Sequence, residues 1–128
     1  MGSIVILFLI VIGACVLKNY LSSAKFKGQF GEHVVAQSLT KRLDPAVYHV
    51  INDVMLDDGM GGTTQIDHVV VSKFGVFCVE TKNYSGWIFG DERGAQWTQS
   101  LPGGRKHHFQ NPLRQNYKHI KVFAQQIK

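Results

Sequence analysis

Residues 65–82, QIDHVVVSKFGVFCVETK, contain two apolar, β-branched runs separated by a short turn that includes Gly75. Two such runs around a glycine-containing turn are typical of a β-hairpin. Side chains alternate between the two faces of a strand, so Glu80 and Lys82 should share one face. If Gly75 takes the left-handed position of a bulged turn, Asp67 lies nearly opposite Glu80 on that face. The sequence therefore predicts two carboxylates and one ammonium group at one end of a hairpin.

Two neighbouring carboxylates are costly in a protein interior, because they repel each other and lose hydration. A divalent cation removes that conflict, and Mg²⁺ accepts carboxylate oxygens, keeps several waters and binds phosphate. A metal-held water is a better nucleophile, and the metal shields charge that develops on a phosphate. Lys82 would position or help to deprotonate the water, or neutralise the phosphate. In a plainer interpretation, Asp67 and Glu80 are solvent-facing strand ends and Lys82 is an ion-pair partner.

The flanking sequence predicts an α/β or α+β fold, with a mixed central sheet flanked by helices. Apolar residues recur at near-helical spacing over 31–43, and Pro45 disfavours continuation of that helix. Pro112 suits the first turn of a second helix, which has apolar residues at Leu113, Tyr117, Ile120, Phe123, Ala124 and Ile127. Further strands are expected over residues 47–54, 86–90 and 95–99, with loops over 57–64 and 103–106.

Ile4–Leu17 is an unbroken run of apolar or small residues. Taken with its flanks as residues 4–21, it approaches the ~20 residues that a bilayer span requires. Lys18 can reach the lipid headgroups, and Tyr20 suits the same layer. Positive charges follow the run, which favours a cytoplasmic location for the chain beyond it.

We therefore expect two parts. Residues 1–24 are an anchor, which spans the inner (cytoplasmic) membrane once, and the start of a connector. The polar stretch that we expect to form this connector covers residues 18–28. Residues 25–128 are a domain facing the cytoplasm. A cleaved signal peptide is the main alternative, with a weak cleavage site at residues 22–24, although no basic residue precedes the apolar run.

The formal net charge of +5, from 14 Lys and Arg against 9 Asp and Glu, favours an anionic partner but does not distinguish nucleic acid from lipid. A net charge of this size is also common in soluble domains that have no anionic partner. The two cysteines, Cys15 and Cys78, exclude a disulfide framework and a zinc ribbon, and no His pair has a convincing zinc spacing.

Several separated segments resemble, in order, the nuclease-related domain (NERD) family: residues 31–32, 65–72, 79–84, 86–88, 96–97 and 109–116. That family is assigned to the PD-(D/E)xK nuclease superfamily, which has the restriction-endonuclease-like fold. The resemblance covers almost everything after Lys25. It is more specific for the fold than for the activity.

The resemblance implies roles for individual residues. Asp67 matches the first motif acid, with Ile66 where the superfamily name places proline, and Glu80 and Lys82 match the (D/E)xK pair. Glu32 matches an acid on the first helix that often completes the metal site, and its plainer role is to complement the helix dipole. In the late segment, the matching residues, which would face the substrate backbone, are Gln110, Asn111 and Gln115.

Other polar and aromatic residues have simpler interpretations beside functional ones. Arg114, Lys118 and Lys121 share one face of the second helix, which would bind phosphates or be merely solvated. His68 should point away from Asp67 and be structural. His107 and His108 are expected in a solvated, basic loop, and Tyr84, Trp87 and Trp97 are expected to pack on a sheet rather than to stack on bases.

We expect a hydrolase that depends on Mg²⁺ or Mn²⁺ and cleaves phosphodiester bonds of nucleic acid, DNA rather than RNA. Asp67 and Glu80 would hold the metal, Glu32 would add a ligand, and Lys82 would assist the attacking water. No small-molecule cofactor is expected. Two alternatives stay open: a membrane-tethered nucleic-acid-binding or assembly module with little turnover, and an interaction domain whose basic face meets anionic lipid.

Overall fold

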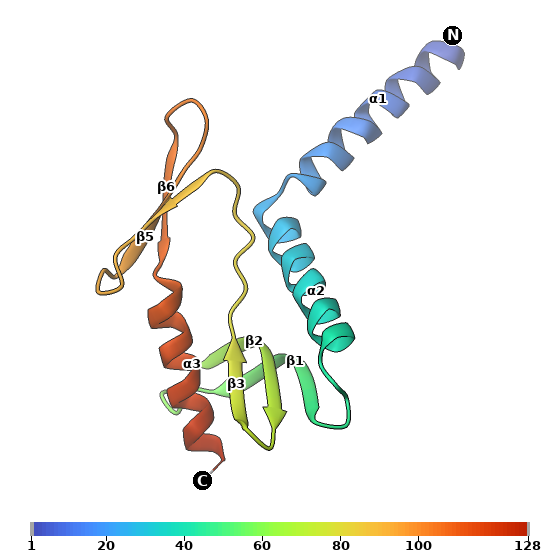
Figure 1. Ribbon diagram of the computed structural model, residues 1–128. Coiled ribbons are helices and arrows are strands. Elements are labelled where there is room, and N and C mark those ends of the chain that lie inside the picture. The colour runs from blue at the N-terminus through green and yellow to red at the C-terminus, as the bar shows by residue number, and fades with distance from the viewer. Residues whose placement is uncertain (1, 128) are drawn as a thin grey trace.

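The computed structural model describes residues 2–127, with side chains described from residue 9 onward. The elements follow one another as three helices and two antiparallel sheets (Figure 1). Their bounds are α1 Gly2–Leu21, α2 Ala24–Arg42, β1 Tyr48–Asp57, β2 Thr63–Ser72, β3 Gly75–Val79, β4 Trp87–Phe89, β5 Gln96–Ser100, β6 Lys106–Gln110 and α3 Pro112–Gln126. The predicted α/β class is confirmed. The mixed sheet is not, because within residues 2–127 both sheets, β1-β2-β3 and β4-β5-β6, are antiparallel.

The first sheet confirms the predicted hairpin and places β2 at its centre. His68, Val69 and Val70 are consecutive buried residues of β2, so both faces of this strand are covered. Ser72 pairs with Gly75, whose φ of +139° lies where glycine is favoured. Strand β3 ends at Val79, so the site residues Glu80 and Lys82 lie just beyond the strand rather than on it.

Helix α2 begins earlier than the sequence indicated. The expected polar connector over residues 18–28 is wrong, because the chain is helical on both sides of Ser22-Ser23. The Ser23 side chain accepts a hydrogen bond from the backbone N–H of Phe26 and so caps α2. The helix ends at Arg42, close to the predicted boundary before Pro45.

Helix α3 starts at Pro112, as predicted, and packs against all three strands of the first sheet. The face that it buries is centred on His119 and Val122. Four residues of its apolar pattern are instead exposed: Leu113, Tyr117, Ile120 and Ile127. Periodicity found this helix, but the side of the helix that meets the sheet was decided by tertiary contacts.

The second sheet contains a strand that the sequence did not indicate. β6 begins at Lys106 and pairs with β5, so His107 and His108 lie on a strand and not in a loop. The sequence did not indicate β6 because its residues are mostly polar and have little preference for strands. The segment becomes a strand only because it pairs with β5. Trp97 packs on this sheet as expected, donating from its indole N–H to the Asp91 carbonyl at 2.9 Å.

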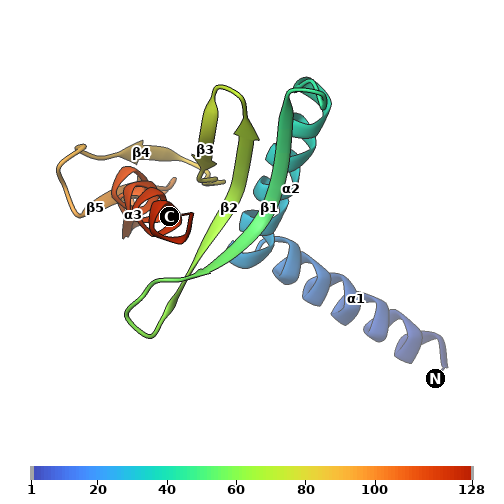
Figure 2. The same ribbon diagram turned by 90° about the horizontal axis from the view of Figure 1, so that it is seen from below.

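Helix α1 projects away from the rest of the chain in both ribbon views (Figures 1 and 2). Within the described residues, no single helix combines the length and the apolar character of a membrane span. Leu9–Leu21 and Ala24–Arg42 pass that test only as a pair, bent by 60°. The membrane anchor at residues 4–21 stays a prediction.

Candidate functional site

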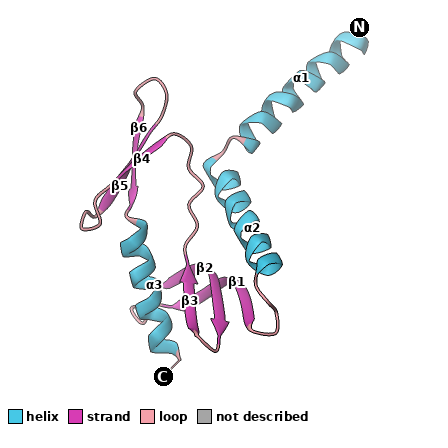
Figure 3. Cartoon of the chain, viewed as in Figure 1, coloured by secondary structure: helices cyan, strands magenta, loops and turns pink. Residues whose placement is uncertain are grey.

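The two acids of the predicted site emerge where β2 and β3 run side by side (Figure 3). His68 pairs with Val79 and Val69 with Cys78. Extending this antiparallel register by one position beyond Val79, where β3 ends, would put Glu80 opposite Asp67. The register thus agrees with the arrangement predicted from the hairpin.

Glu80 is the most enclosed acid of the site, with a side chain only 6% exposed. Its Oε1 accepts a hydrogen bond from Lys82 Nζ at 2.6 Å. Its Oε2 lies 3.3 Å from Nδ1 of His119, although the two atoms are not aligned as a hydrogen bond and both lack another partner. One buried carboxylate therefore lies between a lysine and a histidine, and one of its oxygens is available for a further partner.

His119 is a component of the site that the sequence did not reveal. It is 39 positions from Glu80 along the chain, and its side chain is 3% exposed. The only signal in the sequence was a polar residue within the helical pattern, which is a weak one. The packing of α3 against β3 brings it to the carboxylate.

Thr81, between the two motif residues, links both faces of the hairpin. Its backbone N–H donates to Asp67 Oδ2 at 2.7 Å. Its hydroxyl lies 3.1 Å from Nε2 of His68, whose Nδ1 lies 2.8 Å from the side-chain oxygen of Asn52. An amide oxygen only accepts, so His68 donates from Nδ1 and accepts from the Thr81 hydroxyl.

Burial lowers the pKa of His68, even though the charges of Asp67 and Glu80 oppose that shift. A neutral imidazole is the form that this burial favours. His68 is 1% exposed, so its predicted structural role fits its surroundings. The ring fixes Thr81, and Thr81 in turn fixes the Asp67 carboxylate.

Glu32 stands on α2, which approaches the strand ends closely at Gly31. A Cβ at Gly31 would lie 2.6 Å from Cβ of Asn83, so a larger residue would push the helix away. The Asn83 side chain donates to the Lys27 carbonyl at 2.8 Å and ties the segment after β3 to α2. The helix and the motif segment are therefore fixed relative to each other.

The pKa of Glu32 is raised, first by burial and then by the negative charges of Asp67, Asp53 and Glu80, with Lys82 acting in the opposite direction. Carboxylates from three elements thus repel one another around this point. As the side chains stand in residues 2–127, no group of three or more His, Cys, Asp and Glu is close enough to hold a metal ion. We refer to Glu32, Asp53, Asp67 and Glu80 as the acidic cluster.

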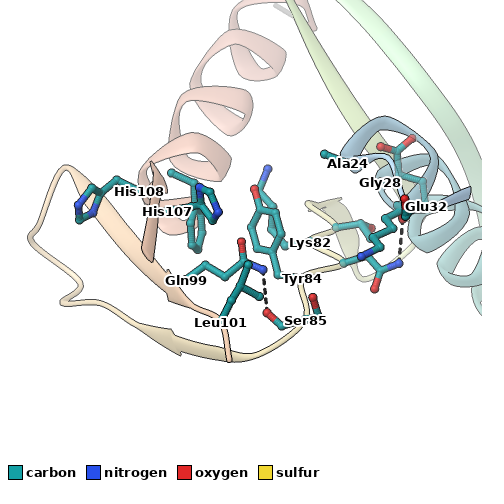
Figure 4. A pocket seen from close by; sticks show the side chains of 15 residues that line it. Ala24, Gly28, Glu32, Lys82, Tyr84, Ser85, Gln99, Leu101, His107 and His108 are labelled. Atoms are coloured by element: carbon teal, nitrogen blue, oxygen red, sulfur yellow. Dashed lines mark hydrogen bonds between the residues drawn. The ribbon is translucent and has the colours of Figure 1, made fainter. Parts of the chain in front are cut away.

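A cavity of about 560 Å³ opens beside this cluster (Figure 4). Glu32 and Lys82 belong to its wall. Tyr84 stands between Lys82 and His107 in the close view. The cavity lies between α2, the segment after β3 and the second sheet, and the sequence predicted two of its lining residues, Glu32 and Lys82, as site residues but not the cavity itself.

The late segment divides into buried and exposed residues. Asn111, expected to face substrate, is fully buried. Its amide nitrogen donates to the carbonyls of residues 91, 92 and 94, and its oxygen caps α3 at Leu113 N–H. Its role here is structural, which corrects the expectation.

Gln115 is half-buried, while Gln110 and Arg114 are exposed. Lys118 Nζ lies 3.8 Å from Asp58 Oδ2, so this lysine already has an acidic neighbour. The exposed side chains of Gln110, Arg114 and Lys118 are accessible to a partner from solution.

Comparison with known proteins agrees with the segments identified in the sequence. A model of the nuclease-related domain family matches residues 27–128. An uncharacterized protein of Bacillus anthracis is 53% identical over 98 residues, which make up 77% of this chain and 45% of that protein. The chain thus spans less than half of that relative's length. No solved structure matches the chain. The family match covers most of the chain, and this protein therefore belongs to the nuclease-related domain family.

Proposed function

We propose that this domain is a metal-dependent nuclease that hydrolyses phosphodiester bonds of nucleic acid, with DNA as its main substrate. The observation that supports this most directly is that Asp67 and Glu80 each lie one position beyond the last β2–β3 pair, His68 and Val79, with Lys82 Nζ 2.6 Å from Glu80 Oε1. Membership of a nuclease-related family points in the same direction.

In this proposal, Asp67 and Glu80 are the residues that would hold Mg²⁺ or Mn²⁺. Mg²⁺ is usually held by one or two carboxylates together with waters and substrate phosphates. Asp67 and Glu80 would be such a pair, and the buried Oε2 of Glu80 makes no hydrogen bond within the described residues, although it lies 3.3 Å from Nδ1 of His119. Glu32, in the same acidic field, is the additional ligand of this proposal. When bound, the ion would supply Lewis-acid activation of phosphate and water.

The protein groups have separate tasks in this mechanism. Thr81 N–H fixes the direction of the Asp67 carboxylate. Lys82, with a side chain 29% exposed, donates from Nζ to a phosphate oxygen and steadies the attacking water. His119 borders the other oxygen of Glu80 and limits the rotation of that carboxylate.

The test is cleavage of plasmid and linear DNA with and without Mg²⁺. Lys82→Ala and Asp67→Ala should each lower cleavage at least ~100-fold, the scale of losing one transition-state contact. Arg93→Ala is the matched control, because Arg93 is an exposed cation whose ion-pair partner is the exposed Glu92. Thermal unfolding of each variant should stay cooperative. Equal activity of Lys82→Ala and the parent protein would end the proposal.

A second function is favoured by one observation, namely that Lys82 already neutralises Glu80 within the chain. On that basis the domain would bind nucleic acid through its basic residues and turn over little or none. Salt-dependent DNA binding that persists in chelator, without cleavage at any tested concentration of Mg²⁺ or Mn²⁺, would select this function.

We also propose that α1 tethers the domain to the inner membrane, with the domain in the cytoplasm. Support comes from the apolar side chains that α1 exposes, among them Leu9, Ile10 and Val16, each more than 60% exposed. A membrane would cover this surface. Alkaline extraction of membranes should release the chain only when residues 2–21 are deleted, and extraction of the full chain would contradict the tether.

A further inference from the structure

The cavity beside the acidic cluster has a size and lining suited to part of a nucleic-acid strand. Its volume of about 560 Å³ lies within the range of pockets that enclose small organic ligands, roughly 300–1,000 Å³. It shares Glu32 and Lys82 with the proposed catalytic site, so a molecule bound there would extend directly to that site. The two sites are parts of one surface.

An aromatic ring stands inside this cavity. Tyr84 is 42% exposed and belongs to the irregular segment after β3, and its expected packing on a sheet is confirmed by its contact with Phe109 of β6. Its ring centroid lies 4.5 Å from that of Phe109, tilted by 57°, so the second sheet supports the ring while part of it stays open. Figure 4 shows the ring upright between Lys82 and Gln99.

The segment that carries Tyr84 is held at both ends. The Asn83 side chain donates to Lys27 O on α2, and the Gln99 side chain donates to Ser85 O at 2.7 Å from β5. A ring that is fixed before binding loses little conformational entropy when it stacks on a ligand.

The charged groups around the ring favour an anionic ligand. Lys27, Lys82 and His107 belong to the lining, and the Lys82 ammonium is already paired with Glu80. Glu32 is the acidic residue of that lining. Cations together with an aromatic face are the groups that recognise single-stranded nucleic acid, where phosphates meet lysines and bases stack on rings.

We propose that this cavity binds unpaired nucleotides next to the scissile phosphate, with one base stacked on Tyr84 and flanking phosphates at Lys27 and Lys82. The inference rests on the proposed nuclease function and specifies its substrate as single-stranded nucleic acid or a frayed end. A paired base keeps its faces within the duplex stack, so only an unpaired base can reach the ring.

The experiment measures binding by the full 128-residue chain in mild detergent and chelator. The probes are a fluorescein-labelled eight-nucleotide oligothymidylate and a hairpin duplex of equal charge, followed by anisotropy. Tyr84→Ala should weaken oligothymidylate binding about 5- to 150-fold, the effect of losing one stacked base, and leave duplex binding within about twofold. Tyr84→Trp should retain binding.

Two controls keep the result interpretable. Tyr117→Ala removes an exposed tyrosine of α3 that is not part of the cavity lining, and it should change neither affinity. Tyr84→Leu keeps an apolar contact for Phe109 without an aromatic face, so it replaces Tyr84→Ala if that variant does not fold.

Equal affinity for the two probes, or oligothymidylate binding that Tyr84→Ala and Tyr84→Leu leave unchanged, would overturn the inference. So would Tyr84-dependent binding to anionic phosphatidylglycerol vesicles in place of oligothymidylate. Failure of the nuclease proposal looks different: single-strand binding would depend on Tyr84, yet no divalent cation would support cleavage.

Discussion

The two sheets differ in how they are stabilised. In the first, β2 is covered on both faces, and Ile66 and Val69 are completely buried. In the second, every residue of β4 is exposed, with Trp87 at 74% and Phe89 at 59%. Burial stabilises in proportion to the apolar surface removed from water, so the first sheet should be much harder to open.

The difference has a functional consequence. Asp67 lies on the well-buried strand β2 and Glu80 just after β3, and the Thr81 N–H orients the Asp67 carboxylate. The second sheet contributes the outer wall of the cavity, at His107 and Phe109. Rigid placement suits catalytic groups, whereas a wall of lower stability can open for a polymer to enter and leave.

Asn111→Ala should give the largest difference in lost stability between the two sheets. The side chain holds the turn at residues 91–94 and caps α3, so its loss should destabilise the chain by about 2–4 kcal/mol. Urea denaturation measures the change in the free energy of unfolding. Hydrogen exchange shows where the change falls, and we expect β5 amides to lose more protection than β2 amides. Gln110→Ala, at an exposed neighbour, is the control. Equal loss of protection in both sheets would mean that they form one cooperative unit.

His68→Leu tests the first sheet. It leaves the Thr81 hydroxyl and the Asn52 side chain without their shared partner, and we expect a cost of about 1–3 kcal/mol. Cleavage should fall as well, because Thr81 orients Asp67. Denaturation and activity should be measured together, with His49→Leu, an exposed histidine of β1, as the control. Unchanged activity would show that Asp67 does not depend on this hydrogen-bond chain.

Two basic residues of α3 offer a finer comparison. The affinity for DNA falls with salt, and Arg114→Ala should make the slope of log affinity against log salt shallower by about 1, the effect of one lost phosphate contact. Lys118→Ala should lower it less, because Asp58 lies 3.8 Å from this lysine. Titrations of DNA binding at several salt concentrations measure both slopes. Equal slopes would indicate that Lys118 leaves Asp58 to bind phosphate.

Asp58 should give the smallest effect. Hydrogen bonds from the backbone N–H groups of Met60 and Gly62 lower its pKa, with a further contribution from Lys118. A carboxyl group whose pKa is lowered by folding stabilises the fold at pH values above its pKa in the unfolded chain, about 3.9. This stabilisation disappears as the pH falls through the pKa of the folded state. Asp58→Asn should therefore be slightly less stable at pH 7, and the difference should vanish at low pH. Thermal unfolding across pH 2–7 checks the direction, and a constant difference would contradict it.

Much of the first sheet and of the site could be predicted from sequence, because short-range patterns specify them. The runs around Gly75 predicted the hairpin, which the pairing of β2 with β3 confirms, whereas Asp67 opposite Glu80 stays a prediction. Pro45 and Pro112 marked helix boundaries through their fixed backbone geometry. Separated segments in the family order indicated the family, and the family match over residues 27–128 confirms it.

The remainder depended on contacts between distant parts of the chain. Strand β6 consists largely of polar residues and takes its conformation from pairing with β5. His119 meets Glu80 because α3 packs on the first sheet, and Asn111 is buried because the turn at 91–94 folds over it. Local periodicity contains no information about such pairings, since their energy comes from groups far away in sequence. The sequence by itself thus determined the hairpin and the family, whereas only the tertiary structure decided which residues surround the acidic pair and form the cavity beside it.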